Sequence, residues 1–419
     1  MASLAFKQRP ASALPVRFFA LGLLGFLLLN ADLARAPQAI RWPLAPGGIL
    51  LLHLTVLGWI TPVMMGADYQ LIPVVLHRPI GRPWIADVVT ALYAGGVGLF
   101  LGGWGAGQPG LVSAGGVAAG CALLLFCAHT GPALIRTDRW GPTALGLGGG
   151  LAFLALTAVL GPWMALSLGG TVTAGGFPVL RLLHATAGLG GWLLLTMMGA
   201  TYRLVPFFAA TNPAVPARFG AAAVLGTGAG LCLILASALV PAIPGAAGLA
   251  VAGAGVALWM YDLGRAVRHG RQARREPVVA YSVAAAAAVG LGGAVAAAAW
   301  RSSPHLALAA ATLALLVGPS LLILGQLQKI LPFIAALDVS LAAKRRGQVP
   351  KTEALFPRER AFVLLWVLGL GFAAELVGVA AGAPELTRGG AIAVLAGAVA
   401  YAAQQGRSFA AWARASRDR

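Results

Sequence analysis

Long apolar runs alternate with short polar connections along the whole chain. A transmembrane helix needs about twenty predominantly apolar residues, and only a helix satisfies the backbone of a lone segment in lipid. We therefore predict an all-α polytopic membrane protein, with residues 1–419 forming a single membrane domain of twelve transmembrane helices. The predicted spans are 15–35, 47–75, 84–105, 110–132, 141–167, 177–208, 216–240, 244–264, 277–300, 304–334, 358–381 and 387–411.

Composition and charge agree with this pattern. Hydrophobic residues make up 59% of the chain and charged residues 10%, which is too little polar surface for a soluble fold. The net charge of +18 does not indicate nucleic-acid binding, because the basic residues do not form a patch. With both termini cytoplasmic, 25 of the 30 Lys and Arg residues lie on the cytoplasmic side. We predict a multi-pass protein of a bacterial cytoplasmic (inner) membrane, with the lipid bilayer as its partner.

An internal repeat is the most informative feature of the sequence. Residues 58–73 and 191–206 share Gly-Trp and, further along, Met-Met-Gly-Ala-x-Tyr-x-Leu-x-Pro, and 325–332 keeps the tail of this motif. The closing prolines are 133 and 126 residues apart. We predict three pseudo-symmetric four-helix units at approximately 15–136, 141–275 and 277–411, with the three motif spans innermost. Cleavage of the first span as a signal peptide would break this repeat, so we interpret that span as permanent.

Histidines occur in all three motif spans. An ionisable residue within the membrane is costly and is a functional candidate by default. At 1.5 Å per residue, His53 lies about 30 Å from Pro73 and His184 about 33 Å from Pro206, whereas His305 lies about 40 Å from its proline. We interpret the two nearly level histidines as ligands, although a membrane histidine can also serve an interhelical hydrogen bond. His305, beside the interface, is interpreted as structural.

The spacing of histidine, Gly-Trp and Gly-x-x-Tyr-x-x-x-Pro resembles helix ten of subunit I of the haem-copper oxidases, especially the cbb3 type. Members of that family have twelve helices in three units of four, with metal-binding histidines on helices two, six, seven and ten. The resemblance extends over the twelve-span layout, but at residue level it covers about 25 residues in two spans and about 10 in a third. It implies an oxidase subunit I-like fold that binds haem.

The chain departs from the family at the positions that reduce dioxygen. Ala310 and Thr312 stand where helix ten of the family carries its His-x-His, and predicted span 216–240 contains no histidine. The resemblance therefore implies a degenerate member without the high-spin haem and copper ligands. We do not expect oxygen reductase activity from the isolated chain.

Two histidines remain in complementary registers of the family motif. His184 precedes Trp192 by eight residues and His53 precedes Trp59 by six, so each occupies one of the two positions of a His-x-His. A two-residue step turns a helix by about 200°. By the family's symmetry, the two imidazoles would meet across one cavity and hold a single bis-histidine, low-spin haem b.

The neighbouring residues admit two interpretations each. Trp59 and Trp192 line the haem cavity or only pack, and Arg181 binds a haem propionate or extends to the membrane surface. The expected function is that of a cytochrome b-like electron-transfer subunit of a respiratory complex, with other subunits or a cytochrome c as partners. Two alternatives stay open. One is a copper-handling carrier or assembly factor, in which the repeated Met-Met pairs supply soft ligands, and the other is a scaffold without metal.

Few other polar residues lie inside the predicted spans. Glu375 could be a protonated spectator, a proton-handling group or a partner of His305. Asp68 and Asp87 lie near the ends of adjacent spans. We expect them to pair with nearby or motif arginines, namely Arg78, Arg82 or Arg203.

Overall fold

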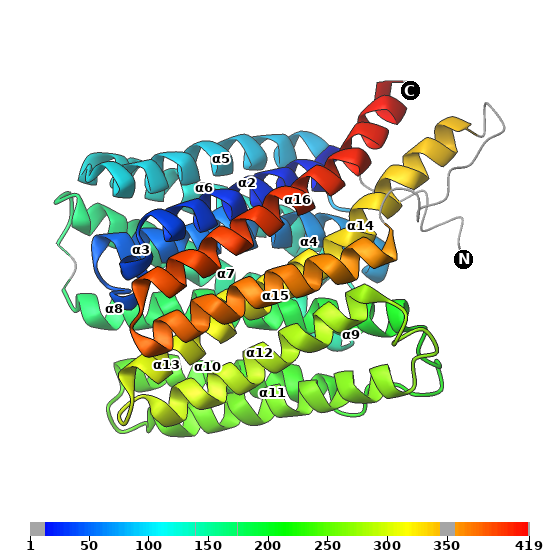
Figure 1. Ribbon diagram of the computed structural model, residues 1–419. Helices are drawn as coiled ribbons and strands as arrows, with labels where there is room; N and C mark the ends of the chain where they lie inside the picture. The colour runs from blue at the N-terminus through cyan, green and yellow to red at the C-terminus, as the bar shows by residue number, and fades with distance from the viewer. Residues whose placement is uncertain (1–12, 139, 174, 344–356, 418–419) are drawn as a thin grey trace. The chain divides into compact units, whose positions relative to one another are not determined.

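The computed structural model describes residues 13–138, 140–173, 175–343 and 357–417, and this part of the chain is almost entirely helical (Figure 1). Twelve helices in it are long and apolar enough to cross a membrane, so the predicted polytopic α-helical architecture is confirmed. These twelve spans are Ala13–Arg35, Pro46–Leu76, Pro83–Ala106, Pro109–Ile135, Pro142–Leu168, Phe177–Ala209, Gly220–Leu239, Gly245–Arg268, Pro277–Ala299, Pro304–Ala336, Arg358–Ala381 and Pro384–Ala411.

Nine of these spans are single helices, and the other three contain more than one helical element. The single helices are α2 (Ala13–Arg35), α5 (Pro83–Ala106), α6 (Pro109–Ile135), α7 (Pro142–Leu168), α10 (Gly220–Leu239), α11 (Gly245–Arg268), α12 (Pro277–Ala299), α15 (Arg358–Ala381) and α16 (Pro384–Arg417). The composite spans are α3 (Pro46–His53), η2 (Leu54–Ile60) and α4 (Thr61–Leu76); α8 (Phe177–Ala185), η3 (Thr186–Leu194) and α9 (Leu195–Ala209); and α13 (Pro304–Thr312), η4 (Leu313–Val317) and α14 (Gly318–Ala343). A short 3-10 helix, η1 (Pro37–Arg41), precedes α3.

Proline defines many helix starts. Pro83, Pro109, Pro142, Pro277 and Pro384 each occupy the first position of a helix. A proline is favourable there because the missing N–H would have no intrahelical acceptor and the fixed φ angle suits a helix. A proline at the end of a short connection therefore marks the start of the next span.

The three composite spans are the three motif spans, and each is interrupted by a π-helical segment. η2 lies 13 to 19 residues before Pro73, η3 lies 12 to 20 before Pro206, and η4 lies 15 to 19 before Pro332. A π-helical segment inserts an extra residue into a helical turn and occurs frequently at functional sites. The sequence repeat is therefore accompanied by a recurring distortion of the backbone.

The glycine of the repeated motif tail makes an equivalent contact in each motif span. Gly66 packs against α2, Gly199 against α7 and Gly325 against α12, which are the spans that immediately precede the motif spans. A Cβ at either of the first two positions would lie 2.9 Å from the nearest atom of the neighbouring helix. Small residues at such positions allow the close helix contacts that hold membrane bundles together.

The described helices belong to two compact units. The first comprises α5 to α11 together with α2 up to Leu21 and the second span from Val56 onward. The second comprises residues 22–55, 208–211 and the chain from Gly270 to its end. In the first unit α6 packs against α5 and α7, and in the second α14 packs against α12 and α16.

Burial distinguishes the motif spans. Pro46–Leu76 and Pro304–Ala336 are the most buried spans, at 61% and 67%, but Phe177–Ala209 is only 39% buried, less than the first span at 56%. The expectation that the three motif spans are innermost stays a prediction, and the sixth span is the least buried of the three. Its outer face, which includes the exposed Leu182 and Phe207, carries apolar side chains that suit contact with lipid.

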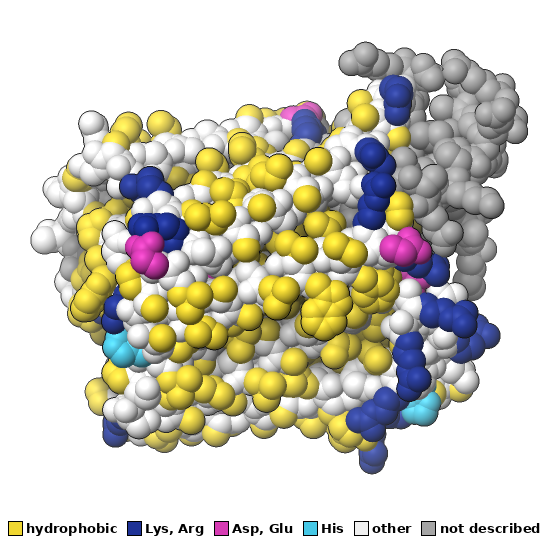
Figure 2. All heavy atoms as spheres, viewed as in Figure 1, with side chains coloured by type: hydrophobic (Ala, Val, Ile, Leu, Met, Phe, Trp, Pro, Cys, Tyr) yellow, Lys and Arg dark blue, Asp and Glu magenta, His cyan; other side chains and the backbone are white. Residues whose placement is uncertain are grey.

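Apolar side chains also cover the exposed faces of other spans. Figure 2 shows hydrophobic side chains along the middle of the helices and Lys and Arg near helix ends. On α15, for example, Val363, Trp366 and Leu370 are each more than 60% exposed. Such surfaces are unfavourable in water and favourable in a hydrocarbon environment. The structure therefore defines a multi-pass protein of the lipid bilayer.

Candidate functional site

His53 ends α3 and directly precedes the π-helical segment η2. Counting from Pro46, it is the eighth residue of its span. Its Nδ1 lies 2.8 Å from the carbonyl oxygen of Ile49, one turn earlier. A carbonyl only accepts, so Nδ1 donates and the lone pair of the neutral imidazole is on Nε2. Backbone fixation of one ring nitrogen is the arrangement that orients metal-binding histidines.

His184 occupies the corresponding place in the sixth span. It is the eighth residue counting from Phe177, and η3 begins two residues later. Gly161 of α7 faces its imidazole, and a Cβ at that glycine would lie 3.1 Å from Cε1 and 3.6 Å from Nδ1. The missing side chain at Gly161 therefore provides the space that the imidazole needs.

The structure thus places His53 and His184 at the same distance from the start of their spans and close to the start of a π-helical segment, although the two residues differ by two positions in the repeated motif. His53 belongs to the second compact unit and His184 to the first. Their pairing across one cavity stays a prediction. Arg181 is exposed and lies one turn before His184, and its contact with a haem propionate likewise stays a prediction.

Both candidate tryptophans are buried. Trp192 Nε1 donates to Thr61 Oγ1 over 3.1 Å, and its ring meets Phe126 edge-on with centroids 6.3 Å apart. Trp192 therefore connects η3 with α4 and α6, which is the packing interpretation of this residue. The indole nitrogen of Trp192 is thus hydrogen-bonded within the protein. Because Trp59 and Trp192 are both buried, their rings contact only other interior groups.

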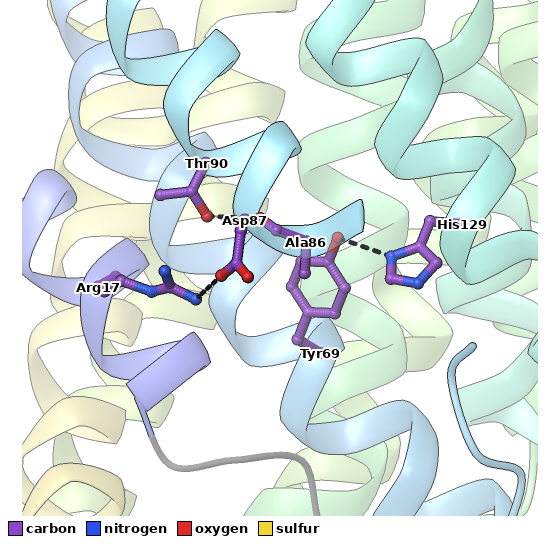
Figure 3. Close-up of polar contacts among 6 residues, drawn as sticks. All are labelled: Arg17, Tyr69, Ala86, Asp87, Thr90 and His129. Carbon is purple, nitrogen blue, oxygen red and sulfur yellow. Dashed lines mark hydrogen bonds and ion pairs between the residues drawn. The ribbon is translucent and has the colours of Figure 1, made fainter. Parts of the chain in front are cut away.

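The tyrosine of the repeated motif contacts the fourth span of its predicted unit in two cases. Tyr69 Oη lies 3.2 Å from His129 Nδ1 of α6 (Figure 3), and Tyr202 Oη lies 3.4 Å from Asp262 Oδ2 of α11. His129 and Asp262 are 133 residues apart, which is also the spacing of the first two motif prolines. These partners of the motif tyrosines were not predicted from the sequence, although the common spacing of His129 and Asp262 was a signal for them.

The expected ion pairs of the two aspartates are corrected by the structure. Asp87 pairs with Arg17 of α2 at 2.7 Å (Figure 3), and Arg78 pairs with Asp138 at 3.5 Å. Asp68 is buried and forms no ion pair within the described ranges. The nearer arginines in sequence were the wrong partners, because α2 brings Arg17 beside the start of α5.

The third motif span carries Ala310 and Thr312 where the resemblance led us to look for histidines. A Cβ at Gly292 of α12 would lie 2.7 Å from the carbonyl oxygen of Ala310, so the two helices meet backbone to backbone there. Thr312 Oγ1 donates to the Leu308 carbonyl within its own helix. His305 is exposed in the first turn of α13. Close helix packing therefore surrounds Ala310 at this point of the third span.

Glu375 of α15 is fully buried. Neither carboxyl oxygen has a hydrogen-bond partner within the part of the chain that the structure describes. The proposed partnership with His305 is therefore wrong, and the spectator and proton-handling interpretations remain predictions.

Across the described ranges, no group of three or more His, Cys, Asp or Glu side chains is arranged to hold a metal ion. The two candidate ligands, His53 and His184, are therefore single imidazoles and do not belong to a larger cluster of metal-binding side chains in the described ranges. No protein-family model matches this chain, and no curated protein sequence matches it.

Proposed function

We propose that this chain is a haem b-binding membrane protein of the oxidase subunit I type, and that it transfers electrons and does not reduce dioxygen. The observation that carries the proposal is the matching placement of His53 and His184. Each is the eighth residue of its span and stands close to the start of a π-helical segment. Two intramembrane imidazoles at nearly the same depth of two repeated helices, two residues apart in the motif, are better explained by a shared ligand role than by two unrelated packing roles.

Three recurring features support a pseudo-symmetric arrangement of three four-helix units. A π-helical segment recurs at the same distance from the motif proline in all three motif spans. The motif glycine packs against the preceding span in all three, and the motif tyrosine contacts the fourth span in two. Contacts that recur with the period of the sequence favour repeated units over a coincidence of helix packing.

The donor chemistry fits a haem. The porphyrin supplies four nitrogen ligands, so two axial imidazoles complete a six-coordinate iron. The Ile49 carbonyl fixes His53 with Nε2 as its ligating nitrogen, and Gly161 leaves space around the His184 ring. In our proposal His53 and His184 are the two axial ligands, Trp59 and Trp192 lie beside the haem, and Arg181 pairs with a propionate.

The same residues explain why electron transfer is the proposed activity. A bound bis-histidine haem supplies a one-electron iron couple with no open position for a substrate. The protein holds both imidazoles on transmembrane helices, and Ala310 and Thr312 provide no third and fourth ligand. We propose a bacterial inner-membrane location with cytoplasmic termini, and respiratory-complex subunits or a cytochrome c as electron partners, on the basis of the charge distribution and the resemblance.

The test is a haem count on the purified full chain. A pyridine haemochrome assay is expected to give one haem b per chain, and the dithionite-reduced minus oxidised spectrum is expected to show sharp α and β bands. A colourless protein that retains copper would replace this proposal with the copper carrier. A colourless, metal-free protein, even after reconstitution with haemin, would favour the scaffold.

A further inference from the structure

A second group of buried polar side chains lies in the second compact unit, apart from the candidate haem ligands. It consists of Gln326 and Gln328 on α14 and of Gln405 and Ser408 on α16, and we call it the amide cluster. All four residues are at most 7% exposed. Amide side chains are rare in transmembrane helices, and those that occur face the interior or a hydrated path.

The amide cluster is only partly satisfied by protein. Gln326 Nε2 donates to Ser282 Oγ over 3.0 Å, and Gln405 Nε2 donates to the Leu327 carbonyl over 3.2 Å and to Tyr401 Oη over 3.0 Å. By contrast, the Oε1 atoms of all three glutamines and the Ser408 Oγ have no hydrogen-bond partner among the residues that the structure describes. Four buried oxygen atoms on two neighbouring helices, together with Gln328 Nε2, therefore lack a hydrogen-bond partner among the described residues.

An unpaired buried polar atom costs about 1–3 kcal/mol, so four together are too costly to leave unsatisfied. Turning the Gln326 or Gln405 amide over does not help, because an unpaired nitrogen would replace the unpaired oxygen and an existing bond would be lost. The unpaired Gln328 Nε2 and the Ser408 hydroxyl are themselves donors, so the cluster needs a partner that both donates and accepts. A water molecule supplies two donors and is the usual partner of otherwise unsatisfied buried groups.

Lys329 and Arg358 do not supply the missing partners. Lys329 Nζ and Arg358 Nη2 each lie 2.9 Å from a carboxyl oxygen of Glu276, so both are engaged in an ion-paired group. The Glu276 side chain is 4% exposed, whereas those of Lys329 and Arg358 are 33% and 40% exposed. Lys329 is also the chain neighbour of Gln328. A charged group that reaches the surface thus adjoins the amide cluster.

We propose that water occupies the amide cluster and enters it beside Lys329 of α14, forming a hydrated site between α14 and α16. Polar interiors of this kind provide water and protons with a route into a membrane protein. The site is independent of haem binding, because none of its residues is a proposed haem ligand. It also gives the third motif span a role after the loss of the family's histidines.

Cysteine accessibility in the full chain tests the proposal. In a background in which Cys121, Cys127 and Cys232 are replaced by alanine, Ser408→Cys is the gentlest probe because the two side chains are nearly isosteric. The protein, in lipid nanodiscs, is treated with the membrane-impermeant reagent sulfonatoethyl methanethiosulfonate. The thiolate displaces methanesulfinate and forms a mixed disulfide, while the thiol proton passes to water. The mass of the intact protein then reports the rate of modification.

Leu331→Cys is the matched control. Leu331 is 2% exposed on α14 and lies nearer to the end of that helix than Gln328 does. We expect Ser408→Cys and Gln328→Cys to react at least about tenfold faster than the control, because modification requires both thiolate and water access. If both react no faster than Leu331→Cys, the cluster is dry or the whole helix end opens, and the proposal is wrong. A Gln328→Cys variant that fails to fold leaves the decision to Ser408→Cys.

Discussion

Gly161→Ala is the substitution that examines the surroundings of one proposed haem ligand most specifically. The added Cβ would lie 3.1 Å from His184 Cε1, whereas carbon atoms in ordinary contact are about 3.5–4.0 Å apart. The imidazole must therefore move by a few tenths of an ångström. Overpacking of this kind costs roughly 1–3 kcal/mol. If this free energy destabilises the haem-bound protein and not the haem-free protein, haem affinity decreases roughly 5- to 150-fold.

The measurement is a haemin titration of the haem-depleted protein, combined with thermal unfolding of the same samples. Gly148→Ala is the control, because it lies on the same helix and its Cβ would meet only the ring of Trp140 at 3.9 Å, an ordinary contact. We expect Gly148→Ala to bind haem as the parent protein does. The reasoning is refuted if Gly161→Ala binds haem with the parental affinity, or if both variants lose affinity equally.

Two further predictions concern the helix contacts of the repeat, and both use unfolding in detergent as the measurement. Gly199→Ala places a Cβ 2.9 Å from the backbone nitrogen of Leu147 on α7, so the two helices must separate. We expect the free energy of unfolding to fall by roughly 1–3 kcal/mol. Gly102→Ala is the control, because its Cβ meets nothing within 4 Å and should cause no loss. Equal stabilities of the two variants would contradict the close contact. Trp192→Phe removes the hydrogen bond to Thr61 and is expected to cost about 1 kcal/mol. In a Thr61→Val background the same change should cost less, and full additivity would show that the bond contributes nothing.

The spans could be predicted from the sequence because hydropathy alone determines which segments can cross a membrane. The predicted span 358–381 has the same bounds as α15, and the predicted spans 177–208 and 277–300 differ from the observed helices by one residue. The repeat likewise identified the three spans that the structure distinguishes by their π-helical segments.

The π-helical segments themselves could not be predicted, because one extra residue in a helical turn leaves the hydropathy of a span unchanged. The partner of Asp87 was missed for a different reason. Arg17 lies 70 residues away in sequence and is brought close only by helix packing. The lower burial of the sixth span also depends on packing, since its motif is nearly identical to that of the well-buried second span. Distortion, long-range pairing and burial are thus tertiary properties that motif and hydropathy do not encode.

Alanine variants of the three motif-span histidines test the central claim most directly. Visible spectra of His53→Ala, His184→Ala and His305→Ala are compared in both oxidation states. The first two are predicted to lose the low-spin, six-coordinate spectrum and to give a five-coordinate or haem-free protein, because each lacks one of the two axial imidazoles. The third should keep the parental spectrum, since His305 is exposed in the first turn of its helix. A parental low-spin spectrum in His53→Ala and His184→Ala, together with loss of haem in His305→Ala, would contradict the proposed ligation.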